Sequence, residues 1–256
     1  GDGDQVAEPG IDKGCVVVFS AGNNGAGANF VRFPARVSGV LGVGALNQLG
    51  QKCAYSPSGV ELDIVAFGGE GGYVESNCLV QQIYQGDIYT TDMRDAGGLN
   101  PCWFPNDIGN QSYTSRFSGT SAAAPQVSGA AALVLSINPN LTEEQVRLIL
   151  LDTATDILPQ GRDNSTGFGR LDIYEALKYT LSNYGGMLTQ GLTIPSGETW
   201  TVQPGVTWSF ASGVTLTVNG VLVANGTYGQ HITFNAVSGT WNGIVLSSSN
   251  GSSIQY

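Results

Sequence analysis

Residues 15–25 read Cys-Val-Val-Val-Phe-Ser-Ala-Gly-Asn-Asn-Gly. The first six form a run rich in β-branched residues, which predicts a strand buried on both faces of a parallel sheet. The turn residues that follow place Asn23 at the carboxyl end of that strand, where open α/β sheets bind ligands. Taken alone, the stretch is better explained by an ordinary turn at the end of a strand.

Outward from this strand, apolar runs of strand length alternate with helical patterns. The predicted elements are strands at 40–46 and 62–67 and helices at 121–137, 142–153 and 172–180. Asn138-Pro139 stops the first helix, Thr142 and Gln145 form a capping box for the second, and Asp172 can cap the third. Strands alternating with helices predict an α/β domain with a parallel sheet and flanking helices.

A second motif, Gly119-Thr-Ser-Ala-Ala-Ala-Pro125, places Ser121 just after a glycine turn and at the start of an Ala-rich helix. Backbone N–H groups at a helix N-terminus favour negative charge, so an oxyanion formed by attack of Ser121 would meet a donor in its own N–H. An amide from Asn23 could reach the same oxyanion. The alternative is that Thr120 or Ser121 only caps the helix.

Together with their surroundings, these residues resemble the subtilases, the subtilisin-like serine peptidases, over about residues 10 to 180. The matching motifs, in the order of the family, are V-V-V-F-S-A-G-N-N-G (16–25), F-P-A (33–35), V-G-A (43–45), Y-S-P-S-G (55–59), L-D-I-V-A (62–66), G-T-S-A-A-A-P-Q-V-S-G (119–129) and G-F-G-R-L-D (167–172).

The resemblance implies roles for individual residues. Ser121 matches the nucleophile and Asn23 the asparagine of the oxyanion hole. The stretch Ser20-Ala21-Gly22, with Gly119 and Thr120, matches the substrate-binding residues, and the substrates would be proteins or peptides. The resemblance implies no organic or redox cofactor, and calcium is an expectation from the family alone.

The sequence also departs from the family pattern. The triad of a subtilase runs Asp, His, Ser, so both partners should precede Asn23. Residues 1–22 contain no histidine. Their aspartates, Asp2, Asp4 and Asp12, lie too late in the family pattern to be the aspartate of the triad. The one histidine, His231, follows the serine. Without a base Ser121 is a weak nucleophile, so the chain is expected to be nearly inactive and to be an internal fragment of a longer polypeptide.

The segment between Gly69 and Tyr113 is longer than in compact subtilases. It contains Cys78 and Cys102. A disulfide between them is expected, with free thiols as the alternative, because an exported protease meets an oxidising medium. Cys15 and Cys53 are expected to be buried free thiols. The insert's acids, Asp87, Asp92, Asp95 and Asp107, form no calcium-loop pattern and are interpreted as solvated turn residues. Because there is no C-x-x-C and one histidine, no metal site is expected.

Composition excludes several classes of protein. Hydrophobic residues make up 41% of 256 residues, which excludes a disordered chain, and 37 glycines indicate many turns. A net charge of −10 argues against a nucleic-acid partner. No stretch approaches the roughly 18 apolar residues of a membrane span. By resemblance the protein is secreted or at the cell surface, although no signal peptide lies within the sequence.

A break in composition divides the chain into predicted domains at 1–184 and 185–256. Of 30 charged residues (10 Lys and Arg, 20 Asp and Glu), only Glu198 lies beyond Lys178. The tail consists of short Thr/Val/Leu/Trp runs between Gly, Pro and Asn turns, which predicts the start of a parallel β-helix. A sandwich is the alternative. Trp200, Trp208 and Trp241 are interpreted as core residues, with sugar binding as the alternative.

These observations predict part of a serine endopeptidase that hydrolyses peptide bonds through Ser121, with Asn23 in the oxyanion hole. Two alternatives remain. One is a catalytically dead scaffold, and the other is an adhesin, in either case with a β-rich tail that binds a surface polymer or a protein. Because the first strands of the sheet would be missing, the isolated chain is expected to expose sheet edge and apolar surface and to be poorly soluble.

Overall fold

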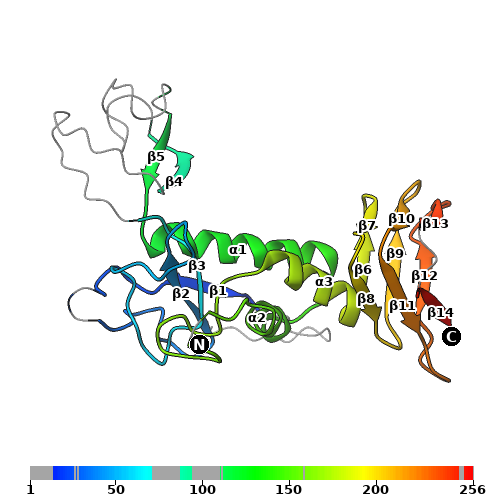
Figure 1. The fold of residues 1–256 in the computed structure, drawn as a ribbon, viewed down its shortest axis with the longest axis horizontal. Coiled ribbons are helices and arrows are strands. Elements are labelled where there is room, and N and C mark those ends of the chain that lie inside the picture. The colour runs from blue at the N-terminus through cyan, green and yellow to red at the C-terminus, as the bar shows by residue number, and fades with distance from the viewer. Residues whose placement is uncertain are drawn as a thin grey trace, which may run out of the picture. The chain divides into compact units, whose positions relative to one another are not determined.

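The computed structural model describes residues 14–25, 27, 29–70, 87–93, 110, 112–157, 159–247 and 251–255. They form two compact units. The first unit combines Cys15–Ala130 with Leu150–Asp172, and the second combines Ala131–Ile149 with Ile173–Tyr256. Figure 1 shows the elements of each unit, and the two are described separately below.

The first unit contains a parallel sheet in the order β1-β2-β3, formed by β1 (Val17–Ser20), β2 (Val40–Leu46) and β3 (Ile64–Phe67). The central strand β2 is buried from Leu41 to Leu46, as expected of a parallel strand covered on both faces. The predicted burial of β1 is wrong. Val17 is 37% exposed and Phe19 40%, because β1 is an edge strand of the described sheet.

The insert contributes an antiparallel pair, β4 (Ile88–Thr91) and β5 (Tyr113–Phe117), to this unit. The two cysteines of the predicted disulfide, Cys78 and Cys102, lie outside the described residues, as do Asp95 and Asp107. Asp87 is only 8% exposed, so its prediction as a solvated turn residue is wrong. Its carboxylate lies against Gly69, where a Cβ would come within 2.7 Å of Oδ1.

Helix α1 (Thr120–Ile137) begins with the predicted nucleophile motif and reaches the predicted end. Its buried side chains are small and recur every three to four residues: Ala122, Ala123, Val127, Ala130, Ala131 and Val134. The expectation that no stretch approaches a membrane span is wrong. By length and composition alone, α1 is long and apolar enough to cross a membrane. A core helix passes the same test, and this row of buried residues belongs to the core.

Helices α2 (Glu143–Asp152) and α3 (Ile173–Tyr184) follow. The capping box is confirmed: Gln145 N–H donates to Thr142 Oγ1 at 3.2 Å, and Thr142 N–H donates to Gln145 Oε1 at 2.9 Å. The predicted end of the last helix near Thr180 is wrong. The helix continues to Tyr184 because Leu181 and Ser182 are buried, and it ends at Gly185, whose φ of +67° suits the left-handed conformation of a helix C-cap.

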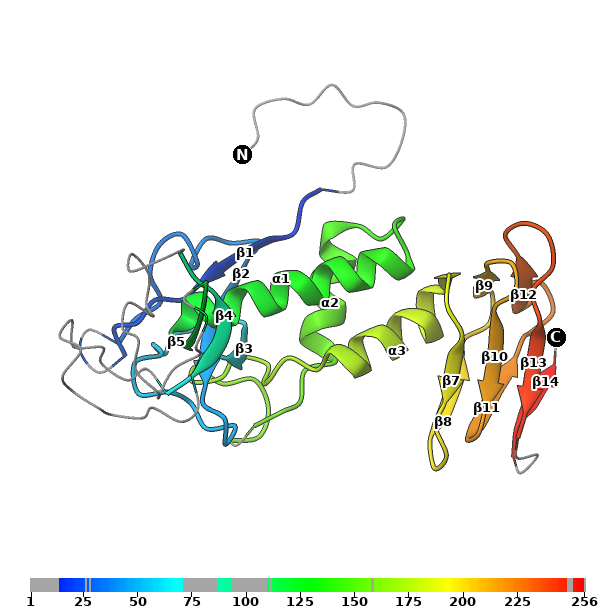
Figure 2. The ribbon, with the colours of Figure 1, turned by 90° about the horizontal axis from the view of Figure 1, so that it is seen from above.

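In the second unit, nine short strands follow α3, listed in chain order: β6 (Gly186–Leu188), β7 (Leu192–Ile194), β8 (Thr199–Val202), β9 (Thr207–Phe210), β10 (Thr215–Val218), β11 (Val221–Asn225), β12 (Thr233–Ala236), β13 (Gly243–Leu246) and β14 (Ser253–Gln255). Each strand pairs in parallel with the third strand after it, which gives three sheets: β6-β9-β12, β7-β10-β13 and β8-β11-β14 (Figure 2). A sandwich of antiparallel sheets does not fit these pairings.

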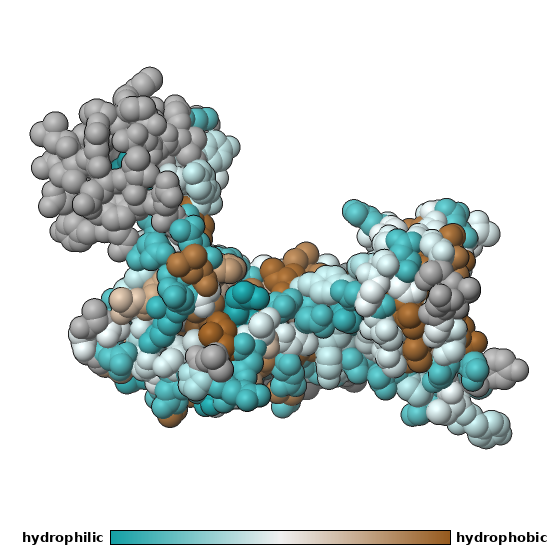
Figure 3. All heavy atoms as spheres, in the orientation of Figure 1, coloured by the Kyte–Doolittle hydropathy of each residue, from teal (hydrophilic) through white to brown (hydrophobic). Residues whose placement is uncertain are grey.

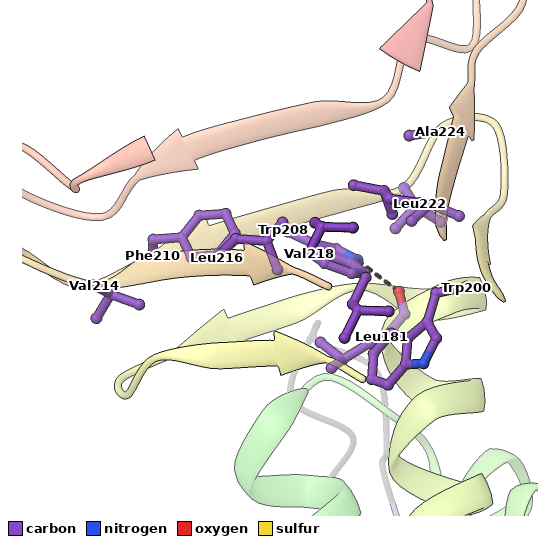
Figure 4. Packing of buried hydrophobic residues seen from close by; sticks show 12 residues of the cluster. Leu181, Trp200, Trp208, Phe210, Val214, Leu216, Val218, Leu222 and Ala224 are labelled. Carbon is purple, nitrogen blue, oxygen red and sulfur yellow. Dashed lines mark hydrogen bonds between the residues drawn. The ribbon is translucent and has the colours of Figure 1, made fainter. Parts of the chain in front are cut away.

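Large apolar side chains fill the space inside these strands (Figure 4). Trp208 is fully buried and Trp200 is 3% exposed, so both are core residues as predicted. Trp208 contacts Trp200 and Phe234 edge to face, and Phe210 stacks on the partly buried Trp241 with ring centres 4.1 Å apart. The Trp208 indole N–H donates to the Leu181 carbonyl of α3 at 2.7 Å.

Candidate active site

The predicted oxyanion asparagine and the predicted nucleophile motif meet at the carboxyl end of β1. Asn23 Oδ1 accepts hydrogen bonds from Thr120 N–H at 3.0 Å and Thr120 Oγ1 at 2.9 Å. The Asn23 N–H₂ group is the other end of the amide and has no hydrogen-bond partner within the part of the chain that the structure describes. It lies against Gly119, where a Cβ would come within 2.8 Å of Nδ2. Residues 97 positions apart in the sequence are therefore held in direct contact.

Ser121 itself is solvent-exposed, in the first turn of α1. Within the described residues its Oγ and its N–H have no hydrogen-bond partner, and the first N–H groups of a helix lack partners inside the helix. An oxyanion beside Ser121 would thus meet the Ser121 N–H and the helix N-terminus, with the Asn23 amide anchored one residue away.

Thr120 is the buried anchor of this arrangement, with no exposed surface. Its Oγ1 lies 3.2 Å from both the N–H and the carbonyl oxygen of Gly22, accepting from the first, and donates to Asn23 Oδ1. Gly22 and Gly119 have φ values of +106° and +109°, conformations that side chains with a Cβ rarely adopt. The predicted substrate-binding residues Gly22 and Thr120 thus form one hydrogen-bonded junction with Asn23, and Gly119 lies against the Asn23 amide.

The other two predicted substrate-binding residues belong to the strand that leads into this junction. Ser20 is the last residue of β1 and is half-buried. Ala21 is fully buried, donates its N–H to the Val43 carbonyl at 2.8 Å and accepts from Arg32 N–H at 2.9 Å. The backbone that leads into Asn23 is therefore fixed by β2 and by Thr120.

A second junction, which the sequence did not indicate, holds the loop before Ser121. The Tyr55 hydroxyl lies 2.8 Å from Gly68 O and 2.9 Å from Gly69 O and accepts from Gly119 N–H at 3.2 Å. Gly119 N–H also donates to Gly68 O at 2.7 Å. Burial raises the pKa of Tyr55, so the hydroxyl keeps its proton at neutral pH.

Cys53 supports the same junction. It is a buried free thiol, as predicted, and its Sγ lies 3.0 Å from Gly69 O. Burial raises its pKa, which disfavours the reactive thiolate. Cys15 is also a free thiol but is exposed, so its predicted burial is wrong; it precedes the edge strand β1.

Gln126 connects helix α1 to the sheet. Its Nε2 donates to Phe67 O at the end of β3 at 2.6 Å and to Ala122 O in the first turn at 2.9 Å. The residue type gave no sign of this role, because an amide in a helix is most often a surface residue. The described residues contain no group of three or more His, Cys, Asp or Glu that could hold a metal ion.

The comparisons with known proteins agree with this geometry. The sequence profile of the Subtilase family matches residues 3–169. The chain belongs to the subtilase family. It is 33% identical over 178 residues to a calcium-dependent protease of Trichormus variabilis, covering 66% of this chain and 25% of that protein. It is 32% identical over 175 residues to Subtilisin Savinase of Lederbergia lenta, covering 68% and 51%.

Among solved structures, a lanthipeptide protease matches with a TM-score of 0.49 and 29% identity, covering 64% of this chain and 50% of that one. This subtilase chain spans a quarter of the length of the Trichormus protease and about half of that of Subtilisin Savinase. The matched region contains Asn23 and Ser121. His231 lies in β-rich residues beyond it, in the second unit.

Proposed function

We propose that this chain carries the nucleophile and the oxyanion hole of a secreted serine endopeptidase that acts on proteins or peptides. The observation that carries the proposal is the double hydrogen bond of Thr120 to Asn23 Oδ1, which holds the Asn23 amide against the residue that precedes the exposed Ser121. Within the described residues the N–H₂ group of that amide has no hydrogen-bond partner. In this proposal Ser20, Ala21 and Gly22 line the pocket for the substrate side chain, with Gly119 and Thr120 at its edge.

The chemistry would run in two steps. Ser121 Oγ attacks the carbonyl carbon of the peptide bond while a base takes the hydroxyl proton; the C–N bond then breaks and the amine leaves with that proton. Water next hydrolyses the acyl-enzyme by the same route and frees Ser121. In both steps the negative oxygen would accept from Asn23 Nδ2–H and Ser121 N–H.

The base is the part of this mechanism for which the sequence offers no histidine before Ser121. Its one histidine, His231, belongs to the second unit. We therefore propose that a histidine and its orienting aspartate come from polypeptide outside this sequence, and that the chain alone is nearly inactive. We also propose that residues 185–256 form a separate domain, the start of a parallel β-helix, because strands repeat in parallel at every third position.

The test is a hybrid in which the upstream Asp- and His-bearing part of a subtilisin is joined before Gly1. We expect the hybrid to hydrolyse a peptide substrate and to react with a serine-directed fluorophosphonate, and Ser121→Ala to abolish both. The matched control is Ser128→Ala, an exposed serine on the same helix, which should leave both unchanged. A folded hybrid that never reacts would instead favour the catalytically dead scaffold.

Two variants of Asn23 separate its catalytic role from its structural one. Asn23→Ala removes both the donor and the Thr120 contact, whereas Asn23→Asp keeps an oxygen for Thr120 and replaces the N–H₂ donor with a negatively charged oxygen that would repel the oxyanion. We expect both to lower kcat by at least ~10²–10³-fold, an effect whose reference case is a subtilisin, with little change in KM. Wild-type kcat in Asn23→Asp would exclude this residue from the oxyanion hole.

A further inference from the structure

Tyr55 contacts both of the loops that form the candidate oxyanion hole. Its backbone carbonyl accepts from Gly25 N–H at 2.8 Å, and Gly25 lies two residues after Asn23. Its hydroxyl accepts from Gly119 N–H at 3.2 Å, and Gly119 lies two residues before Ser121. One residue therefore connects the loop that carries the amide donor to the loop that carries the nucleophile.

The contact with the Asn23 loop is close. At Gly25 a Cβ would come within 2.3 Å of Ser56 O and 2.7 Å of Ala54 O, so a side chain at this position would push the loop away. The loop after Asn23 therefore rests directly on the backbone of residues 54–56.

The contact with the Ser121 loop runs through the hydroxyl. Hydrophilic residues cover much of the first unit in Figure 3, so a tyrosine hydroxyl at its surface could bond to water. The hydroxyl of the half-buried Tyr55 lies instead 2.8 Å from Gly68 O and 2.9 Å from Gly69 O, and it accepts from Gly119 N–H. A Cβ at Gly68 would come within 2.8 Å of both Tyr55 Oη and Gly119 O, so the loop has no room to approach β3 further.

The two N–H groups that precede Ser121 N–H are held by different partners. Gly119 N–H donates to Gly68 O at 2.7 Å and to the Tyr55 hydroxyl, and Thr120 N–H donates to Asn23 Oδ1. The next N–H along the chain is that of Ser121, the proposed donor to the oxyanion. Because peptide groups are planar, fixing the two preceding N–H groups restricts the direction of the third.

We infer that Tyr55 is a positioning residue of the oxyanion hole, which holds the Ser121 N–H and the Asn23 amide at a spacing from which one oxyanion can accept both hydrogen bonds. This inference rests on the proposed function, because it assigns Tyr55 a role in the same reaction. Tyr55 acts through Gly25 and Gly119. Since the oxyanion forms only during the reaction, a misplaced donor lowers kcat and leaves KM nearly unchanged.

Tyr55→Phe in the hybrid described above tests the inference, because it removes the hydroxyl and keeps the carbonyl that binds Gly25. We expect kcat per site titrated with the fluorophosphonate to fall at least ~10-fold, with KM changed less than about twofold. Counting titrated sites removes any loss of folded protein from the comparison. The matched control is Tyr89→Phe, at a 74% exposed tyrosine of the same unit, which should leave kcat and KM unchanged.

A double-mutant cycle separates positioning from general stabilisation. Asn23→Ala removes one of the two donors, so the alignment between them no longer matters, and Tyr55→Phe should lower kcat less than ~3-fold in that background. A tyrosine that only stabilises the fold would lower kcat by the same factor in both backgrounds, and that result overturns the inference. So does a Tyr55→Phe hybrid with the kcat of the unaltered hybrid.

Nuclear magnetic resonance of the hybrid with isotope-labelled asparagine and glycine gives a measurement that does not depend on activity. We expect Tyr55→Phe to move the Asn23 N–H₂ signal together with that of the Gly119 amide, because the Asn23 amide lies against Gly119. Tyr89→Phe should move neither signal. An Asn23 signal that stays in place overturns the inference even in an inactive hybrid, whereas an unaltered, folded hybrid that never reacts overturns the proposed function instead.

Discussion

The first unit fixes its candidate site with buried hydrogen bonds, whereas the second packs large apolar side chains in layers. In the first, Thr120 and Tyr55 each contact backbone or side-chain groups from segments far apart in the chain, and the buried row of helix α1 is made of alanine and valine. In the second, Trp208, Phe210 and Leu216 are fully buried, and repetition of one strand pattern builds the core. The first unit thus depends on a few specific hydrogen bonds, whereas the second depends on a repeated strand pattern.

The largest effect should come from removing the centre of the apolar layers. Trp208→Ala deletes a fully buried indole and the bond to Leu181 O, so we expect a loss of about 3–5 kcal/mol in the free energy of unfolding, measured by urea denaturation. Tyr228→Ala, at a fully exposed aromatic residue of the same unit, should change stability by less than about 0.5 kcal/mol. Equal losses for the two variants would contradict a layered apolar core.

A smaller loss should follow removal of one hydroxyl from the first unit. Tyr55→Phe keeps the ring but withdraws the group that links Gly68, Gly69 and Gly119. We expect a cost of about 1–3 kcal/mol, since the partly buried backbone groups lose a partner. The control is Tyr89→Phe, where the side chain is 74% exposed and stability should not change. A Tyr55→Phe chain as stable as the wild type would show that the junction does not hold the loop.

The contrast between the units also explains what the sequence could predict. Local patterns sufficed for β2, whose apolar run matched the strand at both ends, and for the Thr142–Gln145 capping box. The turn residues after the strand placed Asn23 at its carboxyl end, and the resemblance to subtilases paired Asn23 with Ser121. The signals for β2, for the capping box and for the place of Asn23 lie within a few residues of the feature they predict.

Features that depend on a distant neighbour escaped prediction. The exposure of β1 follows from its edge position, which the run Val-Val-Val-Phe cannot reveal. The extra turn of α3 depends on burial of Leu181 against strands that follow it in the chain. The roles of Tyr55 and Gln126 depend on carbonyl groups supplied by the ends of β3, and nothing in either residue type identifies those partners.

The smallest effect should come from the one charge in the layered region. Glu198 accepts from Tyr174 OH at 2.8 Å, Trp200 Nε1 at 3.0 Å and Lys178 Nζ at 3.3 Å. The bond from Tyr174, followed by those from Trp200 and Lys178, lowers the pKa of Glu198 below 4.5. Because the native pKa is the lower one, the ionised carboxylate stabilises the fold above pH 4.5, and this contribution disappears as pH falls through the native pKa.

Glu198→Gln should therefore lower the melting temperature slightly near pH 7, by an amount equivalent to less than about 1 kcal/mol, because the group lies at the surface. The difference from wild type should shrink in acid, where Glu198 becomes neutral as glutamine is. Glu175→Gln alters the more exposed carboxylate bonded to the same lysine, Lys178. It should lower the melting temperature by less than Glu198→Gln does. If the two variants behaved alike at every pH, Lys178 alone would account for the effect, and the Tyr174 and Trp200 bonds would contribute nothing. The layered region would then owe its stability to apolar packing throughout.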